Sequence, residues 1–232
     1  MKRYFTSPTF ALLGLLGMTG CGGVSNALSD KKHSVEYYRI YDLKTQASKQ
    51  VLGKAASDGL GQNTGKVSTT SPIPTSAEVP EKAGRFKVVD PLAGTKLGQL
   101  AASSGGFGLR MAECEGAVWT AKAVRTITGS NQLNLWTCLY PYKDGYHLDM
   151  YATFAKVEGG LGEITRQMAY AATGTPEEWT EKTFTDVIRQ IHQQTGAAIT
   201  YVEGYPDPGP LPWHDGGSQP AQQPSSQTKT PG

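Results

Sequence analysis

The segment Lys143-Asp-Gly-Tyr-His-Leu-Asp-Met-Tyr-Ala-Thr-Phe154 combines a turn dipeptide with an alternating apolar pattern. Asp144-Gly145 between aromatic residues is typical of a β-hairpin turn, in which the central residues need positive φ angles. From Tyr146 to Phe154 every second residue is apolar, and most of the residues between are polar. Because successive side chains of a strand point to opposite faces, we expect a strand over 146–157 with one buried face and one more polar face.

Two further strands are expected upstream, over 117–128 and 132–141, with Gly129-Ser130 as the break between them. In the second of these strands three leucines alternate with Trp, Cys and Tyr residues, so we expect both of its faces to be at least partly covered. Consecutive strands joined by short turns predict an antiparallel meander. Residues 163–172 fit a helix or a strand, and the spacing of their larger side chains favours a fourth strand of the meander.

The best-defined helix begins at Thr175-Pro-Glu-Glu178. This sequence supplies a capping hydroxyl, a proline at the first helical position and a glutamate three residues after the cap, which together form a capping box. An apolar stripe follows, and Gly196 ends the helix. The stripe comprises Phe184, Val187, Ile188 and Ile191. Residues 197–202 predict a closing strand. Since a meander needs cover for its apolar face, we expect this helix to pack there.

Upstream of the meander, the composition predicts a strand over 35–41 and a helix over 47–56. Residues 59–84 are rich in Gly, Ser, Thr and Pro, which indicates a flexible loop. The expected fold class is therefore α+β, an antiparallel β-meander with a C-terminal helix packed on one face, plus an N-terminal strand-helix unit. We expect one globular domain over 34–205 and a disordered Pro/Gln/Ser-rich tail over 206–232.

The N-terminal residues carry an export signature. Lys2 and Arg3 form a positive segment, a short apolar run covers 10–18, and small residues precede Cys21. The apolar run is far below the roughly twenty residues that cross a bilayer, so it indicates a signal segment rather than a membrane span. The sequence Met18-Thr19-Gly20-Cys21 resembles the lipobox of bacterial lipoproteins.

This resemblance implies lipid modification of the chain. In bacterial lipoproteins the cysteine receives a diacylglycerol group, the chain is cut just before it, and the new amino group is acylated with a fatty acid such as palmitate. Residues 1–20 would then be the signal peptide, and 21–33 the lipid anchor and spacer. Gly22 stands where an inner-membrane retention signal has Asp, so the resemblance implies the outer membrane of a Gram-negative host, with the domain facing the periplasm. Several acyl chains anchor a protein far more strongly than one.

Charge and cysteine usage narrow the possible partners. The formal net charge is +2, and removal of Lys2 and Arg3 with the signal peptide brings it to 0. A neutral domain without a polybasic run is poorly suited to nucleic-acid binding, which relies on phosphate neutralisation.

Cys114 and Cys138 remain once Cys21 carries lipid, and an oxidising compartment favours a disulfide between them. Two unrelated buried thiols are the alternative, and neither cysteine stands in a metal-binding pattern.

Catalytic candidates are few. His147, Asp149 and Tyr151 share one face of a predicted strand, about 6.5 to 7 Å apart along it, and could place a base beside a carboxylate. The sequence has no GxSxG or HExxH motif to supply a nucleophile or a metal site, so a polar, solvent-facing strand fits these residues better. The stretch from Gly59 to Lys66 departs from the phosphate-loop motif at two positions. We therefore expect no cofactor.

Aromatic residues on the predicted strands could instead form a contact surface for a peptide, glycan or protein, because Tyr and Trp offer rigid amphipathic area. Core packing explains them equally well. The best surface candidates are Trp136, Tyr140 and Tyr142. The expected function is that of a lipid-anchored envelope protein that binds or scaffolds another envelope component without catalysis. The alternatives are a small hydrolase centred on His147 and Asp149, or a carrier of an apolar ligand between sheet and helix.

Overall fold

In the computed structural model, the described residues are 31–73, 78–103, 109–127, 131–160 and 162–209. The expected signal peptide, the lipidation site at Cys21 and the tail from residue 210 onward lie outside these ranges. In chain order the elements are β1 (Lys31–Lys44), α2 (Lys49–Gly61), β2 (Lys66–Thr70), β3 (Lys87–Val89), α3 (Lys96–Ser103), β4 (Met111–Glu113), β5 (Trp119–Ile127), β6 (Asn131–Tyr142), β7 (Gly145–Glu158), α4 (Glu163–Thr173), α5 (Pro176–Thr195) and β8 (Ala198–Tyr205). Among the described helices, none combines the length and the apolar character that crossing a membrane requires.

Within the described residues, the main sheet has six strands in the order β2-β5-β6-β7-β1-β8, and every neighbouring pair is antiparallel. β5, β6 and β7 follow one another as the predicted meander, and Tyr142 pairs with Gly145 across the turn between β6 and β7. β1 lies between β7 and β8, so the N-terminal strand belongs to the same body as the meander. The fold class is α+β, as predicted.

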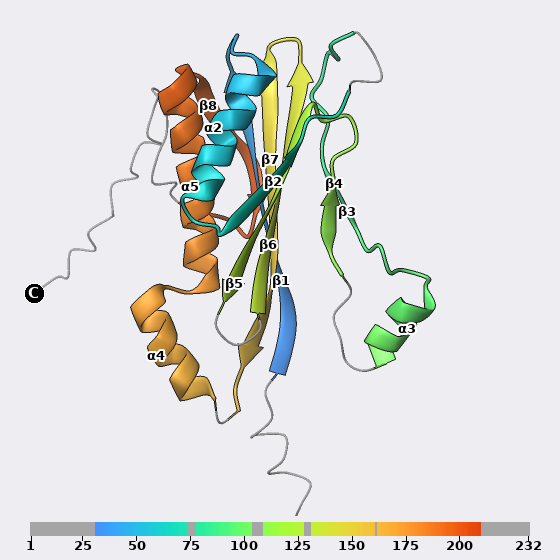
Figure 1. Ribbon diagram of the computed structural model, residues 1–232, viewed down its shortest axis with the longest axis vertical. Helices are drawn as coiled ribbons and strands as arrows, with labels where there is room; N and C mark the ends of the chain where they lie inside the picture. The colour runs from blue at the N-terminus through green and yellow to red at the C-terminus, as the bar shows by residue number, and fades with distance from the viewer. Residues whose placement is uncertain (1–30, 74–77, 104–108, 128–130, 161, 210–232) are drawn as a thin grey trace, which may run out of the picture.

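Helices α2 and α5 cover one face of this sheet (Figure 1). α5 begins with the predicted capping box, because Glu178 N–H donates to Thr175 Oγ1 at 3.1 Å and Thr175 N–H donates to Glu178 Oε2 at 2.9 Å. The apolar stripe of α5 packs against side chains from the sheet and from α2. The shared core includes Leu43, Leu52, Leu60, Leu133, Leu135, Leu139, Leu148, Met150, Phe154, Phe184, Val187, Ile188 and Ile191. The helix that was predicted to cover the meander therefore does so.

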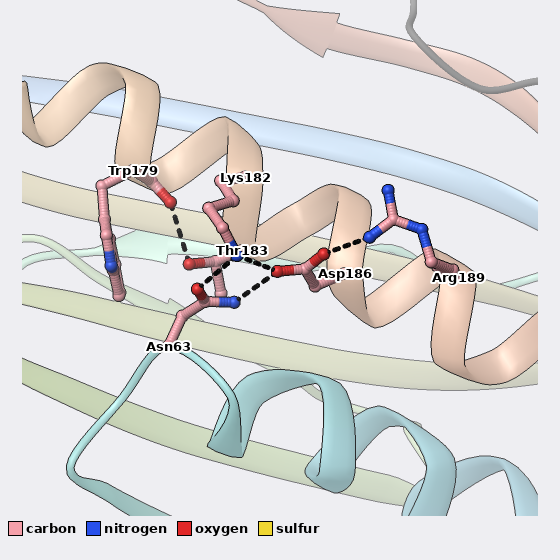
Figure 2. A network of polar contacts seen from close by, with 6 residues as sticks. All are labelled: Asn63, Trp179, Lys182, Thr183, Asp186 and Arg189. Atoms are coloured by element: carbon pink, nitrogen blue, oxygen red, sulfur yellow. Dashed lines mark hydrogen bonds and ion pairs between the residues drawn. The ribbon is translucent and has the colours of Figure 1, made fainter. Parts of the chain in front are cut away.

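A polar network joins the end of α2 to α5 (Figure 2). Asn63, just beyond α2, donates from Nδ2 to Asp186 Oδ2 at 2.8 Å and accepts from Lys182 Nζ at 2.9 Å. Arg189 Nη1 donates to Asp186 Oδ1 at 2.5 Å. Burial raises the pKa of Asp186, but the hydrogen bonds from Lys182 and Asn63 outweigh burial and hold that pKa below its usual value. The charged carboxylate thus fixes the end of α2 on α5.

The opposite face of the main sheet carries a second, smaller layer, which lies to the right of the sheet in Figure 1. We call the β3–β4 pair and the chain segments beside it, residues 85–90 and 111–118, the second layer. Buried residues on this side are Ile40, Phe86, Ala112, Ala117, Trp136, Cys138, Tyr140 and Tyr151. A disulfide between Cys114 and Cys138, with Cα atoms 5.6 Å apart, attaches the second layer to β6. The predicted pairing of these cysteines is confirmed, and β6 is covered on both faces as expected.

Three expectations about single elements are wrong. Residues 163–172 lie within helix α4 rather than in a fourth strand of the meander, because their apolar side chains recur at helical spacing. Residues 66–70, expected within a flexible loop, form β2 and pair with β5. Most of their side chains are polar and exposed, so they carry no alternating pattern. α2 continues to Gly61, so residues 59–61 belong to this helix and not to the expected loop. Gly59 serves packing there, because α5 approaches it too closely for a side chain.

Candidate functional site

The aromatic residues expected to form a contact surface are mostly internal. Trp136 and Tyr140 are only 7% and 0% exposed, because the second layer covers this face of β6. The expectation of an exposed surface is therefore wrong for both residues, and core packing explains them. Tyr142 is half-buried near the end of β6, where its hydroxyl donates to Asp42 Oδ1 at 2.5 Å and Lys44 Nζ lies 4.7 Å from the centre of its ring.

His147 and Asp149 lie on the same face of β7 but in different surroundings. Asp149 is 1% exposed, and its Oδ2 accepts a hydrogen bond from Phe86 N–H at 3.1 Å. Burial raises the pKa of Asp149 to about 7 despite this hydrogen bond. His147 is half-buried, with Nε2 3.9 Å from Asp42 Oδ1, and burial lowers its pKa. The expectation of a solvent-facing strand is wrong at Asp149 and Tyr151, because the second layer covers both side chains, and a substrate has no access to the buried carboxyl.

Two other kinds of site find no support among the described residues. They contain no group of three or more His, Cys, Asp or Glu side chains placed to hold a metal ion. The space between the main sheet and helices α2 and α5 is filled by apolar side chains. A pocket of the described residues lies elsewhere, along the edge of β1.

β1 is longer than its neighbour β8, and part of its outer edge is free. β7 pairs with β1 from Lys31 to Leu43, whereas β8 pairs with it only from Tyr38 to Lys44. Among the described strands, none lies against the outer edge of residues 31–37. Alternate residues of an edge strand direct their backbone N–H and C=O groups outward. Residues 31–37, which we call the free edge of β1, are therefore a template for another extended chain.

A groove of about 710 Å³ runs along the free edge. Six consecutive residues of β1, from His33 to Tyr38, line this groove. Because successive side chains point to opposite faces of a sheet, a space that contacts all of them must extend along the edge rather than lie above one face. The groove thus occupies the position that a further strand beside β1 would take.

Each wall of the groove combines rings with charged groups. On the side of the second layer, the ring of Phe86 lies 5.7 Å from the ring of Tyr38, and Glu36 and Arg85 line the same wall. On the side of α5, Lys156 Nζ lies 3.0 Å from Glu177 Oε1, and Tyr37 lines the same wall. A strand in this position would direct alternate side chains toward these two walls.

The chain does not extend β8 along the free edge. Tyr205 is the last residue of β8 and lies opposite Tyr38. Pro206 and Pro208 follow, and proline has no N–H to donate to a neighbouring strand. Pro206 lines the groove, and residues 206–209 form no strand. The prolines therefore leave the position beside 31–37 open to a different segment.

Sequence patterns do not reveal this edge. They predict the strands over 35–41 and 197–202 separately and carry no information on how these strands pair. The available signal was Pro206 and Pro208 directly after the closing strand, since proline within a sheet is confined to edges and strand ends. Those prolines indicate where β8 stops, but only the register shows that β1 continues past that point.

Comparison with known proteins identifies no family for this chain. No family model matches it, and no curated protein matches it significantly. Among solved structures, the chain is similar to a conserved protein from Geobacillus kaustophilus, with 11% sequence identity and a TM-score of 0.29. The match covers 69% of this chain and 98% of that chain. A similarity at this level carries no information about function.

Proposed function

We propose that this chain is a lipid-anchored protein of the bacterial cell envelope that binds an extended segment of a partner protein at the free edge of β1, without catalysis. The segment would lie in the groove beside residues 31–37 and add one strand to the main sheet. The anchor would be the acylated Cys21, which the lipobox resemblance implies, and the domain would face the periplasm from the outer membrane. The disulfide between Cys114 and Cys138 supports an oxidising compartment.

The observation that carries the proposal is the difference in pairing between the two sides of β1. The same strand is paired with β7 along nearly its whole length, yet β8 leaves it at Tyr38. Main-chain hydrogen bonds to an added strand would give affinity that depends little on sequence. The two walls would give specificity, because alternate side chains of the added strand would meet different residues of the groove.

The walls define the kind of segment that fits. Tyr38 and Phe86 on one wall and Tyr37 on the other suit apolar or aromatic side chains, and the charged groups of both walls suit polar ones. The expected segment is therefore an extended stretch that carries apolar and polar residues on both of its faces, without proline where it pairs with β1. A glycan could stack on the aromatic rings but would gain little from the backbone groups of the free edge.

Photo-crosslinking in living cells tests the proposal. A photoreactive residue at Ser34 would report on the free edge of β1, and the same residue at Thr69 of β2 would report on the opposite edge of the sheet. Both positions are exposed. We expect a discrete protein adduct from Ser34 and none from Thr69. The crosslinked residues of the partner should fall within one short segment, and the backbone amides of residues 31–37 should exchange more slowly in the complex.

The anchor is tested separately by adding Cys21→Ala to the chain that carries the Ser34 probe. The adduct should be lost if membrane attachment brings the partner and the groove together. Equal adducts from Ser34 and Thr69, or an adduct made of two copies of this chain, would contradict the proposed partner. A carbohydrate adduct at Ser34 would show that the groove binds a glycan and not a protein segment.

A further inference from the structure

Helix α4 presents its apolar residues away from the protein. Ile164 and Met168 are 73% and 70% exposed and lie one turn apart on the same face of the helix. The polar side of α4 contacts the preceding turn instead. Gly159 N–H donates to Glu163 Oε2 at 3.0 Å, and Arg166 Nη2 donates to the same oxygen at 3.1 Å. A helix of a globular domain ordinarily buries its apolar stripe. The reversed orientation indicates a face that something outside the domain covers.

Helix α3 shows a similar arrangement. Leu97 and Leu100, three residues apart on one face, are largely exposed, and so is Leu109 beyond the helix. Neither α3 nor α4 makes an extensive contact with another described element. Two short amphipathic helices from separate parts of the chain therefore carry uncovered apolar side chains.

Both helices lie at the end of the molecule where β1 begins. Lys31, the first residue of β1, pairs with Glu158, the last residue of β7, and α4 starts at Glu163. Figure 1 shows α3 and α4 at the lower end of the long axis, on either side of the start of β1. Cys21 precedes Lys31 by ten residues, which span at most about 35 Å when fully extended. A lipid on Cys21 would therefore be held close to these two helices.

We propose that this end of the protein lies on the bilayer that holds the lipid anchor, with the apolar faces of α3 and α4 inserted at the level of the headgroups. This inference rests on the proposed anchor at Cys21. Lys31 and Lys32 at the start of β1 and Lys96 at the start of α3 are exposed, whereas Glu158 and Glu163 are paired with Lys156 and Arg166. The exposed lysines suit anionic headgroups. Apolar side chains combined with neighbouring basic residues are typical of helices that lie in a membrane interface.

The anchor makes the bilayer the favoured occupant of these faces. A lipid attached within about 35 Å keeps the membrane surface at a high effective concentration, so weak insertion of two small apolar faces is sufficient for docking. A freely diffusing protein partner would need a larger surface to bind as well. Docking would hold residues 31–37 beside the membrane and would present the groove to segments that emerge close to the bilayer surface.

Tryptophan quenching tests this inference with the lipidated, full-length chain. The protein is reconstituted into vesicles of phosphatidylethanolamine and phosphatidylglycerol, with or without brominated phospholipid, which quenches tryptophan inside the bilayer. One variant carries Met168→Trp in α4, and the control carries Asp144→Trp in the turn between β6 and β7, at the opposite end of the long axis. The native tryptophans contribute the same background to both. We expect the brominated lipid to remove most of the added emission of Met168→Trp and none of that of Asp144→Trp.

The two proposals fail in different ways. A processed protein that does not float with the vesicles shows that the lipid anchor is wrong, and the docking inference falls with it. If the protein floats but the Met168→Trp emission is quenched no more than that of Asp144→Trp, the docking inference is wrong. The proposed lipid anchor is unaffected by that result. Adding Ile164→Asp to Met168→Trp should reduce the quenching, and unchanged quenching would also overturn the docking inference. A blue shift of the Met168→Trp emission that grows with the density of protein on the vesicles, without quenching by bromine, would indicate that a second copy of the chain covers this face of α4.

Discussion

Gly59 of α2 lies directly against the backbone of Val187 in α5. A Cβ atom at position 59 would come within 2.5 Å of Val187 Cα and 2.9 Å of Val187 N. Backbone atoms cannot move aside as the end of a flexible side chain can, so any larger residue must push the two helices apart. The close approach keeps both helices seated on the core that contains Leu60 and Phe184.

Gly59→Ala should lower the free energy of unfolding by about 1–2 kcal/mol, because an overpacking cost of about 2–3 kcal/mol exceeds the gain of about 1 kcal/mol in helix propensity. The matched control is Gly61→Ala at the end of the same helix, where an added Cβ meets open space. That control should leave stability unchanged or raise it slightly. Urea denaturation of both variants measures the difference, and similar effects of the two substitutions would contradict the packing argument.

Arg39 is fully buried between the main sheet and α5, where its guanidinium pairs with Glu181 and Nη1 donates to Tyr38 O at 2.7 Å. Glu181→Gln should lower the free energy of unfolding by about 1–3 kcal/mol, because it leaves a buried positive charge without its counter-ion. Glu177→Gln, one turn earlier, is the control, since its partner Lys156 is partly exposed and such a pair contributes about 0–1 kcal/mol. Equal losses in chemical denaturation would show that burial of Arg39 is irrelevant.

Asp149 should make stability depend on pH. Its pKa in the folded protein, about 7, lies above the ordinary value of 3.8, mainly because burial disfavours the charged form. Between about pH 4 and pH 7 the folded state keeps a proton that the unfolded state has lost, so the free energy of unfolding falls as the pH rises. The stabilising contribution is complete below this range and lost above it, and it amounts to roughly 4 kcal/mol.

Asp149→Asn should remove this dependence while keeping an oxygen that accepts from Phe86 N–H. The measurement is denaturant unfolding of both proteins at several pH values between about 5 and 8. The stability of the variant relative to the native protein should rise with pH, and the other carboxylates cancel because both proteins contain them. A difference that stays constant across this range would refute the raised pKa.

The disulfide should stabilise the fold by restricting the unfolded chain, by an amount that grows with the logarithm of the loop length. Cys114 and Cys138 are 24 residues apart, for which the chain-entropy model gives about 3–4 kcal/mol. Unfolding with and without a reductant measures this contribution, and limited proteolysis of the reduced protein should cut first between β3 and β4. A Cys114→Ala/Cys138→Ala variant should show no response to the reductant. A native protein equally stable in both conditions would contradict this prediction.

The meander and α5 were predictable because their signals are local. Asp144-Gly145 specifies a turn, and the capping box at 175–178 specifies where a helix begins. β2 lacks such a signal, because it is an edge strand whose side chains are mostly polar and exposed. α4 was misread because Ile164 and Met168 are four residues apart, a spacing that fits one turn of a helix and also the alternation of a strand.

The candidate site depends on contacts between distant parts of the chain, which sequence patterns do not encode. Trp136 and Tyr140 were interpreted as surface residues because the layer that buries them contains strands of only three residues, too short to show a period. The groove arises from the register between β1 and β8, in which Tyr38 lies opposite Tyr205. The composition of β1 predicts a strand whether or not another strand covers its edge.

The bond between Cys114 and Cys138 stands beside the buried carboxyl, because Asp149 is the partner of Cys138 across the β6–β7 ladder. With the thiols reduced, the second layer could leave the sheet, and water reaching Asp149 would let its carboxyl ionise at neutral pH. Closing that layer again requires the carboxyl to regain a proton or to be buried with its charge.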